Sequence, residues 1–165
     1  MRDRSRRFVA EAALAGALAG APVPAAERID AATDRPAADL SGRACTGIAS
    51  FYAKMFFGRT MADGTPMDPA GDNAASRTLP LGTRARVTNL RTGRSAVVTI
   101  RDRGPYVKGR IVDLSPAIAR SIGITPRMGL AKVEVKPIYV PLPDGRVLWG
   151  EGSRVATATG QLRTE

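Results

Sequence analysis

The chain has 165 residues, of which 44% are hydrophobic and 5% are aromatic. This length fits one domain of ordinary size, about 100–150 residues, with additional segments and a mostly aliphatic core. The sequence contains no histidine and a single cysteine, Cys45. These counts exclude sites that need an imidazole, an intrachain disulfide or several cysteine ligands. Catalysis would have to use carboxylates, hydroxyls, amines or backbone dipoles, and we expect no metal and no other cofactor.

The net charge is +10, with 25 Lys and Arg residues against 15 Asp and Glu. This charge favours a polyanionic partner such as nucleic acid, anionic lipid or an acidic cell-wall polymer. An arginine-rich composition that serves solubility would give the same charge. Platforms that bind single-stranded nucleic acid interleave aromatic residues with basic ones. The chain is poor in aromatic residues, so we expect no nucleic-acid partner.

Residues 1–25 have the layout of a secretory signal peptide. Four arginines between positions 2 and 7 precede the apolar segment 8–21, and Val23 and Ala25 suit the −3 and −1 positions of a cleavage site. We therefore predict a leader over 1–25 and export to the periplasm or cell envelope, the alternative being an Ala-rich arm that is not cleaved. The sequence has no run of 18 apolar residues, so we expect no transmembrane span.

Residues 26–45 predict a linker, because Ala, Asp, Arg and Pro dominate and no hydrophobic period is visible. Cys45 ends this segment. Arg43 interrupts the run of small residues that a lipoprotein signal needs. We therefore expect no lipid anchor on this cysteine.

The segment 46–138 predicts one small domain that is mainly β. Apolar and polar residues alternate, or form short apolar runs, in five candidate strands, at 47–52, 83–90, 95–101, 110–114 and 130–138. Ser115 and Pro116 predict the N-cap and first residue of a short helix that Gly123 ends. Residues 53–79 are rich in turn residues and predict a long functional loop, and 139–165 predict a polar tail. Short strands, long loops and one or two short helices indicate a small six-stranded β-barrel flanked by flexible tails.

Asp102 is the most informative candidate for chemistry, because it follows an alternating strand, lies between Arg101 and Arg103, and precedes a Gly-Pro corner. A carboxylate at a barrel rim can face a groove while a strand holds its backbone. Flanking arginines lower the pKa of such a carboxyl and burial raises it, and a general acid needs burial to dominate. The alternative is an Asp102–arginine pair that fixes the turn.

Asp113 lies two residues before the predicted N-cap, where a carboxylate is stabilised by the helix dipole, so a structural role at the helix entry is expected. Asp63 and Gly64 predict a turn. Four aromatic residues near the same loops are candidates either for stacking on sugar rings or for the core: Tyr52, Phe56, Phe57 and Tyr106.

Five segments together resemble the RlpA family (rare lipoprotein A). They read GxASFY at 47–52, ADGTPMD at 62–68, NAASRTLPLGT at 73–83, RDRGPY at 101–106 and GRIVDLS at 109–115. The resemblance runs from about Thr46 to Pro137. It implies a double-psi β-barrel, the fold that this family shares with expansins and barwin-like proteins.

The resemblance also implies an envelope protein that acts on peptidoglycan as a lytic transglycosylase. Such an enzyme cleaves glycan strands, preferably without stem peptides, between N-acetylmuramic acid and N-acetylglucosamine, and leaves a 1,6-anhydro end. One carboxylic acid protonates the glycosidic oxygen, and the resulting carboxylate assists attack by the muramic C6 hydroxyl, so a second carboxylate is not obligatory. Protein partners in division or in the envelope are not indicated by the sequence.

The aspartates of two family motifs are present as Asp102 and Asp113, and we expect Asp102 to be the catalytic residue. The Glu and His that many members carry are replaced by hydroxyl side chains, which do not donate protons near neutral pH. The expected substrate-binding residues are Thr65 and Ser76 at those two positions, with Arg77, Arg101, Arg103, Tyr106 and Asp113. Two interpretations remain open: an active transglycosylase that relies on Asp102, or a non-catalytic, expansin-like module that binds peptidoglycan.

Overall fold

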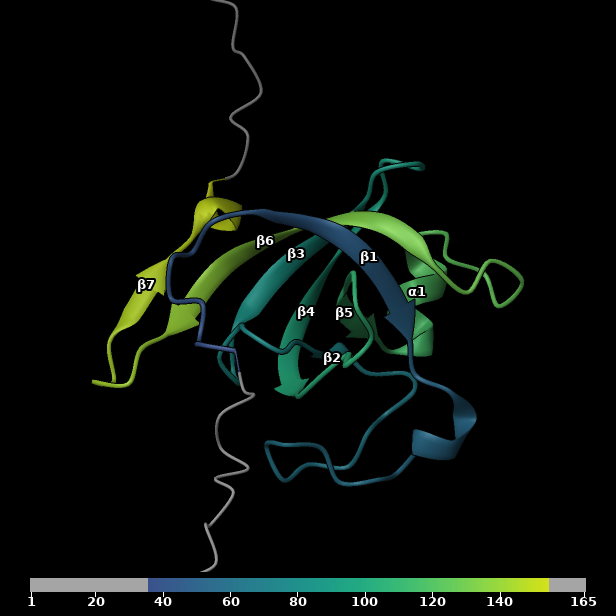
Figure 1. The fold of residues 1–165 in the computed structure, drawn as a ribbon, viewed down its shortest axis with the longest axis horizontal. Coiled ribbons are helices and arrows are strands. Elements are labelled where there is room, and N and C mark those ends of the chain that lie inside the picture. The colour runs from purple at the N-terminus through teal and green to yellow at the C-terminus, as the bar shows by residue number, and fades with distance from the viewer. Residues whose placement is uncertain (1–35, 155–165) are drawn as a thin grey trace, which may run out of the picture. The chain divides into compact units, whose positions relative to one another are not determined.

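The computed structural model describes residues 36–154. The predicted leader over 1–25 lies outside these residues, as does the end of the predicted tail. Six strands form a closed barrel, in which the pairing of the first strand with the last closes the sheet (Figure 1). In sheet order they are β1 (Cys45–Phe51), β5 (Arg110–Leu114), β2 (Asn73–Ala75), β4 (Ser95–Asp102), β3 (Arg84–Asn89) and β6 (Ala131–Pro141).

The strand order identifies the fold. β1 pairs with β5 and β2 pairs with β4 in parallel, and the other barrel pairs are antiparallel. Neither β1 nor β2 lies beside the next strand of the chain, and β2 is inserted between β4 and β5. The chain is therefore a mainly β protein with a six-stranded double-psi β-barrel, which confirms the predicted fold class.

The alternating patterns position the core as predicted. In β3 the side chains of Ala85, Val87 and Asn89 are fully buried, and in β4 so are Val98 and Ile100. The turn between these strands contains a glycine with a φ of 70°, a conformation that suits a hairpin turn.

The predicted helix is also present as α1 (Pro116–Ser121). Ser115 is its N-cap, and its hydroxyl accepts a hydrogen bond from the backbone N–H of Ile118 at 3.2 Å. The chain leaves the helix at Gly123, which has a φ of 84°. Ile122 and Ile124, on either side of this glycine, are fully buried and fix the helix against the barrel.

Several elements have no clear signal in the sequence. Strand β2 and the short helix η1 (Lys54–Phe56) lie within the segment predicted as one long loop. Strand β7 (Val147–Trp149) and the short helix η2 (Glu151–Ser153) lie in the predicted polar tail, and β7 pairs with β6. These elements have three residues each, too few for a period to be visible. The segment before β1 also contacts the barrel, because the backbone N–H of Asp39 donates to Thr78 O at 2.9 Å.

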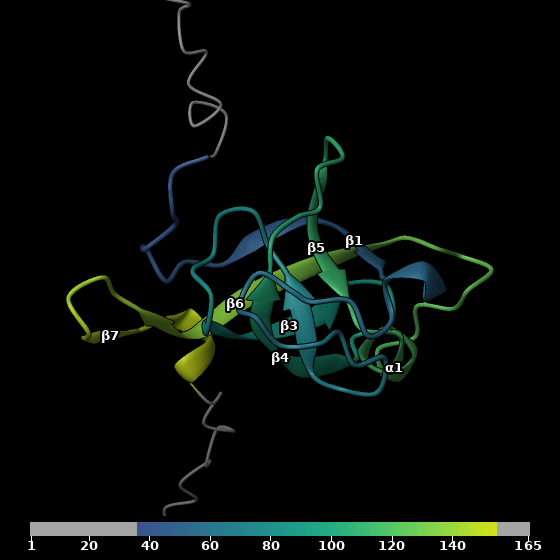
Figure 2. The same ribbon diagram turned by 90° about the horizontal axis from the view of Figure 1, so that it is seen from below.

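The connection from β1 to β2 covers the end of the barrel at which β4 ends. Its central part is a small hairpin, closed by an antiparallel bridge between Thr60 and Pro66. The backbone N–H of Asp63 donates to Arg101 O at 2.9 Å and attaches this hairpin to β4. Figure 2 looks onto this end and shows the loops that cross it, together with the loop that projects before β5.

Candidate active site

Barrel closure places two carboxylates at the same end of the sheet. Ser50 of β1 is the cross-strand neighbour of Asp113 of β5, and Ala75 of β2 is the neighbour of both Asp113 and Asp102. The two aspartates are thus separated by one strand. Two strand spacings of about 4.8 Å put their Cα atoms about 10 Å apart.

Three donors converge on the carboxylate of Asp102. Its Oδ1 accepts the backbone N–H groups of Ala62 at 3.0 Å and Arg103 at 2.8 Å, and its Oδ2 accepts the hydroxyl of Tyr52 at 2.9 Å. This arrangement suits an ionised carboxylate, whose oxygens only accept hydrogen bonds. Within residues 36–154 no guanidinium group pairs with Asp102, so it is not the arginine-paired turn that the sequence left open.

Tyr52 is a permanent donor in this arrangement. Its side chain is only 8% exposed. Burial raises the pKa of the Tyr52 hydroxyl far above its usual range, and the negative charge of Asp102 and the hydrogen bond to it add to this effect. The hydroxyl therefore keeps its proton and fixes the orientation of Asp102.

Asp113 has a different environment. Burial raises the pKa of its carboxyl above the usual value, and the charge of Asp102 acts in the same direction, although Ser50 and Arg110 oppose the shift. Ser50 donates its hydroxyl to Asp113 Oδ1, and Arg110 Nη1 lies 3.4 Å from Ser50 Oγ. The carboxyl group of Asp113 thus lies in a polar cluster with Ser50 and Arg110. The side chain that caps α1 is that of Ser115. Burial therefore favours the neutral form of the Asp113 carboxyl, which is the form that a general acid needs.

A hollow of about 250 Å³ opens beside Asp102. The residues around it come from the β1–β2 connection, including η1 and its hairpin, and from the end of β4: Tyr52, Phe56, Arg59, Thr60, Met61, Met67 and Asp102. Phe56 is 42% exposed, and its ring meets the ring of Tyr52 edge to face, with 6.1 Å between the centroids. Of the four aromatic candidates, Tyr52 belongs to a small buried cluster, whereas Phe56, Phe57 and Tyr106 are exposed.

Thr65 and Ser76 use their hydroxyl groups within the protein. Thr65 donates its N–H and its hydroxyl to Asp63 Oδ1, at 2.9 and 2.6 Å. Ser76 is buried, and its Oγ accepts the N–H of Leu79 at 3.2 Å. Both hydroxyls therefore stabilise turns next to the two aspartates.

The arginines on either side of Asp102 hold loops in place. Arg101 pairs with Asp63 at 3.3 Å. Burial tends to raise the pKa of Asp63, but hydrogen bonds from Thr65 and Arg101 lower it overall. Arg103 Nη1 donates to the backbone carbonyls of Ser76 at 3.1 Å and Leu79 at 2.6 Å. These contacts fix both the hairpin and the segment after β2.

Arg77 and Tyr106 differ from these residues, because their side chains are exposed. Together with Arg103 they border a second hollow of about 170 Å³. Among the residues predicted to bind substrate, these two remain the most available to a ligand.

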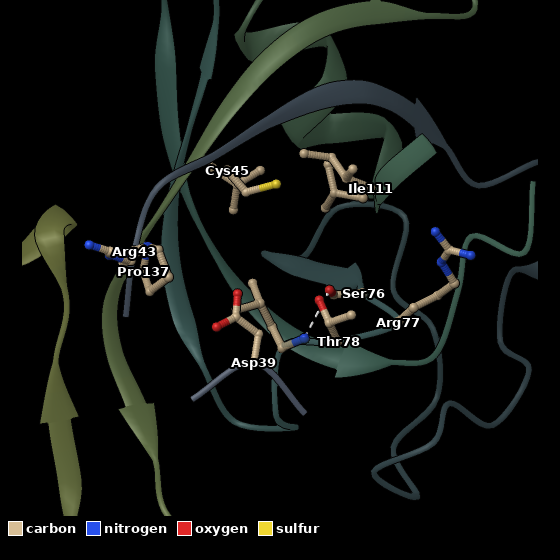
Figure 3. A pocket seen from close by; sticks show the side chains of 11 residues that line it. Asp39, Arg43, Cys45, Ser76, Arg77, Thr78, Ile111 and Pro137 are labelled. Atoms are coloured by element: carbon tan, nitrogen blue, oxygen red, sulfur yellow. Dashed lines mark hydrogen bonds between the residues drawn. The ribbon is translucent and has the colours of Figure 1, made fainter. Parts of the chain in front are cut away.

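A third hollow, of about 180 Å³, lies between β1, β6 and the segment after β2 (Figure 3). Ser76 and Arg77 border it, as do Cys45 and Ile111, but neither Asp102 nor Asp113 does. Residues that precede β1 close one side of it through the bond from Asp39 to Thr78. The sequence did not indicate this hollow, because residues 26–45 were expected to form a linker.

Two further observations concern the described part of the chain. Residues 36–154 hold no group of three or more His, Cys, Asp or Glu that could hold a metal ion. In the same range, none of the helices has the length and apolar character needed to cross a membrane.

The fold and the site together define a double-psi β-barrel protein with two carboxylates at one barrel end, the kind of group that general acid–base chemistry uses. The family model described as lytic transglycolase matches residues 44–135. The chain belongs to this family, as the RlpA motifs predicted.

Curated relatives share this region. A protein of Nostoc sp. named "Probable endolytic peptidoglycan transglycosylase RlpA" is 41% identical over 143 residues, which cover 81% of this chain and 37% of the relative. An "Endolytic peptidoglycan transglycosylase RlpA" of Pasteurella multocida is 51% identical over 102 residues, covering 62% and 34%. The chain thus spans about a third of the length of these relatives. Among solved structures, Streptomyces papain inhibitor is similar at 25% identity and a TM-score of 0.46, over 59% of this chain and 97% of the other.

Proposed function

We propose that this protein is an endolytic lytic transglycosylase that acts on peptidoglycan in the cell envelope. The observation that carries the proposal is the placement of Asp102 and Asp113 at one barrel end with different electrostatic environments. Membership in the lytic transglycolase family supports the same reaction. The curated relatives carry names that state this activity.

The proposed reaction divides the proton transfers between the two aspartates. Asp113, whose neutral form is favoured by burial, donates its proton to the oxygen that links C1 of N-acetylmuramic acid to N-acetylglucosamine. The C1–O bond breaks, and the sugar on the far side leaves as an alcohol. The C6 hydroxyl of the same muramic residue then bonds to C1, and its proton passes to the carboxylate of Asp102. The product has a 1,6-anhydro ring, no water is consumed, and solvent returns the proton from Asp102 to Asp113.

This assignment modifies the sequence-based hypothesis, which gave both steps to Asp102. The three donors around Asp102 suit a group that begins the reaction ionised and receives a proton. Tyr52 is a positioning residue, because it touches Asp102 and is itself buried. We assign the binding of the glycan strand to Arg77 and Tyr106, whose side chains are exposed beside the site.

The test is to incubate the purified protein with glycan strands whose stem peptides an amidase has removed, and to look for 1,6-anhydro-muramic ends by mass spectrometry. Asp102→Asn is the sharpest variant, because the amide oxygen can accept the two backbone N–H groups and the amide nitrogen can donate to Tyr52. Asp113→Asn tests the proton donor. We expect either variant to lose about 100-fold or more of the rate, the usual contribution of a general acid or base. No anhydro product from the unaltered protein would refute the enzyme proposal.

A second candidate is a non-catalytic, expansin-like module that binds peptidoglycan. One observation favours it: Thr65 and Ser76, which stand where many family members carry Glu and His, use their hydroxyls in internal turns. Retention on isolated sacculi without any anhydro product would support this candidate.

A further inference from the structure

The β6–β7 ribbon carries a pair of aromatic rings, of which Trp149 is exposed and Tyr139 is half-buried. Tyr139 of β6 and Trp149 of β7 are cross-strand partners, and their rings meet edge to face with 6.2 Å between centroids. Trp149 is the one tryptophan of the chain and is 69% exposed. Figure 1 shows β7 as an extension of the sheet beyond β6. A large ring held in solvent by a strand is unusual and marks a candidate binding surface.

The chain just after β7 is packed closely against β6 and the segment before β1. A Cβ atom at Gly150 would lie 2.4 Å from Pro137 O, and one at Gly152 would lie 2.5 Å from Lys136 O, so both glycines permit close backbone packing. The backbone N–H of Glu151 donates to Gly42 O at 2.9 Å. The two rings are therefore presented on a rigid support, which lowers the entropy that a ligand has to overcome.

The chemistry of this surface suits a sugar. The C–H face of a pyranose ring packs on the electron-rich face of an aromatic ring. Arg84 of β3 is the cross-strand neighbour of Tyr139 on its other side, and its side chain is exposed. An arginine beside the rings can bind a carboxylate such as the lactyl group of muramic acid.

The size of the surface argues against a stable protein partner. Each of the two aromatic side chains can bury at most about 150–250 Å² of surface. A stable protein interface buries about 800 Å² on each partner. A single chain of sugars needs far less area than a folded partner does.

The surface and the two aspartates lie toward the same end of the barrel. Arg84 pairs with Thr99 of β4, three residues before Asp102. The row from Thr99 across β3 and β6 to Trp149 spans three strand spacings, about 15 Å in all. A glycan strand of several sugars can span this distance and reach both places at once, whereas a disaccharide cannot.

We propose that Tyr139 and Trp149, with Arg84 beside them, form a second glycan-binding surface that holds long strands while a distant part of the same strand occupies the site at Asp102. This inference rests on the proposed peptidoglycan substrate. It assigns the ribbon to substrate retention and leaves the chemistry to the two aspartates.

The fluorescence of Trp149 reports binding at this surface, because the chain has no other tryptophan. The Asp102→Asn variant, which is expected to slow turnover about 100-fold or more, is titrated with long amidase-treated glycan strands and with disaccharide fragments. We expect the emission of Trp149 to change with the long strands at a concentration at which the fragments have little effect. Unchanged emission while sedimentation shows bound strands would overturn the proposal.

Retention on sacculi gives the second measurement. Trp149→Ala is expected to weaken retention about fivefold or more, and Tyr139→Ala to weaken it as well. Val147→Ala is the matched control, because Val147 is an exposed residue of the same strand without a ring. Equal retention of Trp149→Ala and Val147→Ala would overturn the proposal. The two proposals fail separately. A Trp149 response in the variant, with no anhydro product from the unaltered protein, refutes only the enzyme. Anhydro product from the unaltered protein, with unaltered retention of Trp149→Ala, refutes only the second surface.

Discussion

The hydrogen bond from Tyr52 to Asp102 can be tested by a double-mutant cycle on the free energy of unfolding. Tyr52→Phe removes the hydroxyl that lies 2.9 Å from Asp102 Oδ2 and leaves the ring packed against Met61 and Met67. A hydrogen bond to a charged group contributes about 1.5–3 kcal/mol. We expect Tyr52→Phe alone to destabilise the protein by an amount in this range.

The same substitution has a different effect once the acceptor is gone. In Asp102→Ala the Tyr52 hydroxyl is left buried without its partner, which costs about 1–3 kcal/mol. Adding Tyr52→Phe removes that orphaned hydroxyl, so the second substitution is neutral or stabilising in this background. The expected coupling energy between the two sites is therefore at least about 1.5 kcal/mol.

The assay is urea unfolding at pH 7 of the four proteins of the cycle, with the slope m compared to verify that the same cooperative unit unfolds. Thermal unfolding gives a second value, since 1 kcal/mol moves Tm by about 4 °C in a domain of this size. Tyr106→Phe is the control, because Tyr106 is 78% exposed, and we expect it to change stability by less than about 0.5 kcal/mol. Single effects that add within about 0.5 kcal/mol would refute the bond and the placement of Asp102.

Three further predictions concern stability. Burial raises the pKa of Asp113 above its unfolded value, so stability falls as pH rises from about 3.8 through the folded pKa. Asp113→Asn cannot ionise, so it does not lose this stability. The Tm of Asp113→Asn minus the Tm of the unaltered protein should therefore be larger at pH 7 than at pH 3. A Tm difference that is the same at both pH values contradicts the raised pKa of Asp113. Thr83 is fully buried and its hydroxyl has no partner in the structure, so Thr83→Val should stabilise by about 1 kcal/mol in urea unfolding, and a clear loss would mean that the hydroxyl is bonded. Gly150→Ala places a Cβ against Pro137 O and should cost about 1–3 kcal/mol, with faster hydrogen exchange in β7; unchanged exchange in β7 would contradict this close packing.

The sequence determined the local elements whose residues carry their own signal. The strands β3 and β4 follow from alternation over six and eight residues, and α1 follows from Ser115, Pro116 and Gly123, which act on their immediate neighbours. The family motifs indicated the double-psi β-barrel and pointed to Asp102 and Asp113 as site residues. Strands β2 and β7 were not predicted, because three residues show no period and their stability comes from pairing with distant strands.

Tertiary structure decided what the functional groups do. Asp102 and Asp113 are eleven positions apart in the chain, and only the insertion of β2 between β4 and β5 places them on either side of Ala75. The shift in the pKa of Asp113 depends on burial and on the charge of Asp102, quantities that exist only once the barrel has closed.

The same holds for the hydroxyl and arginine side chains. Thr65, Ser76 and Arg103 are polar residues near the site, and their types suggested sugar binding. Their hydrogen-bond partners, among them the Ser76 and Leu79 carbonyls that Arg103 reaches, come from turns that form only in the folded chain. The sequence by itself therefore determined which residues gather at the barrel end. The closed barrel decided which of them remain free for a ligand, because a polar group already hydrogen-bonded within the fold is less available.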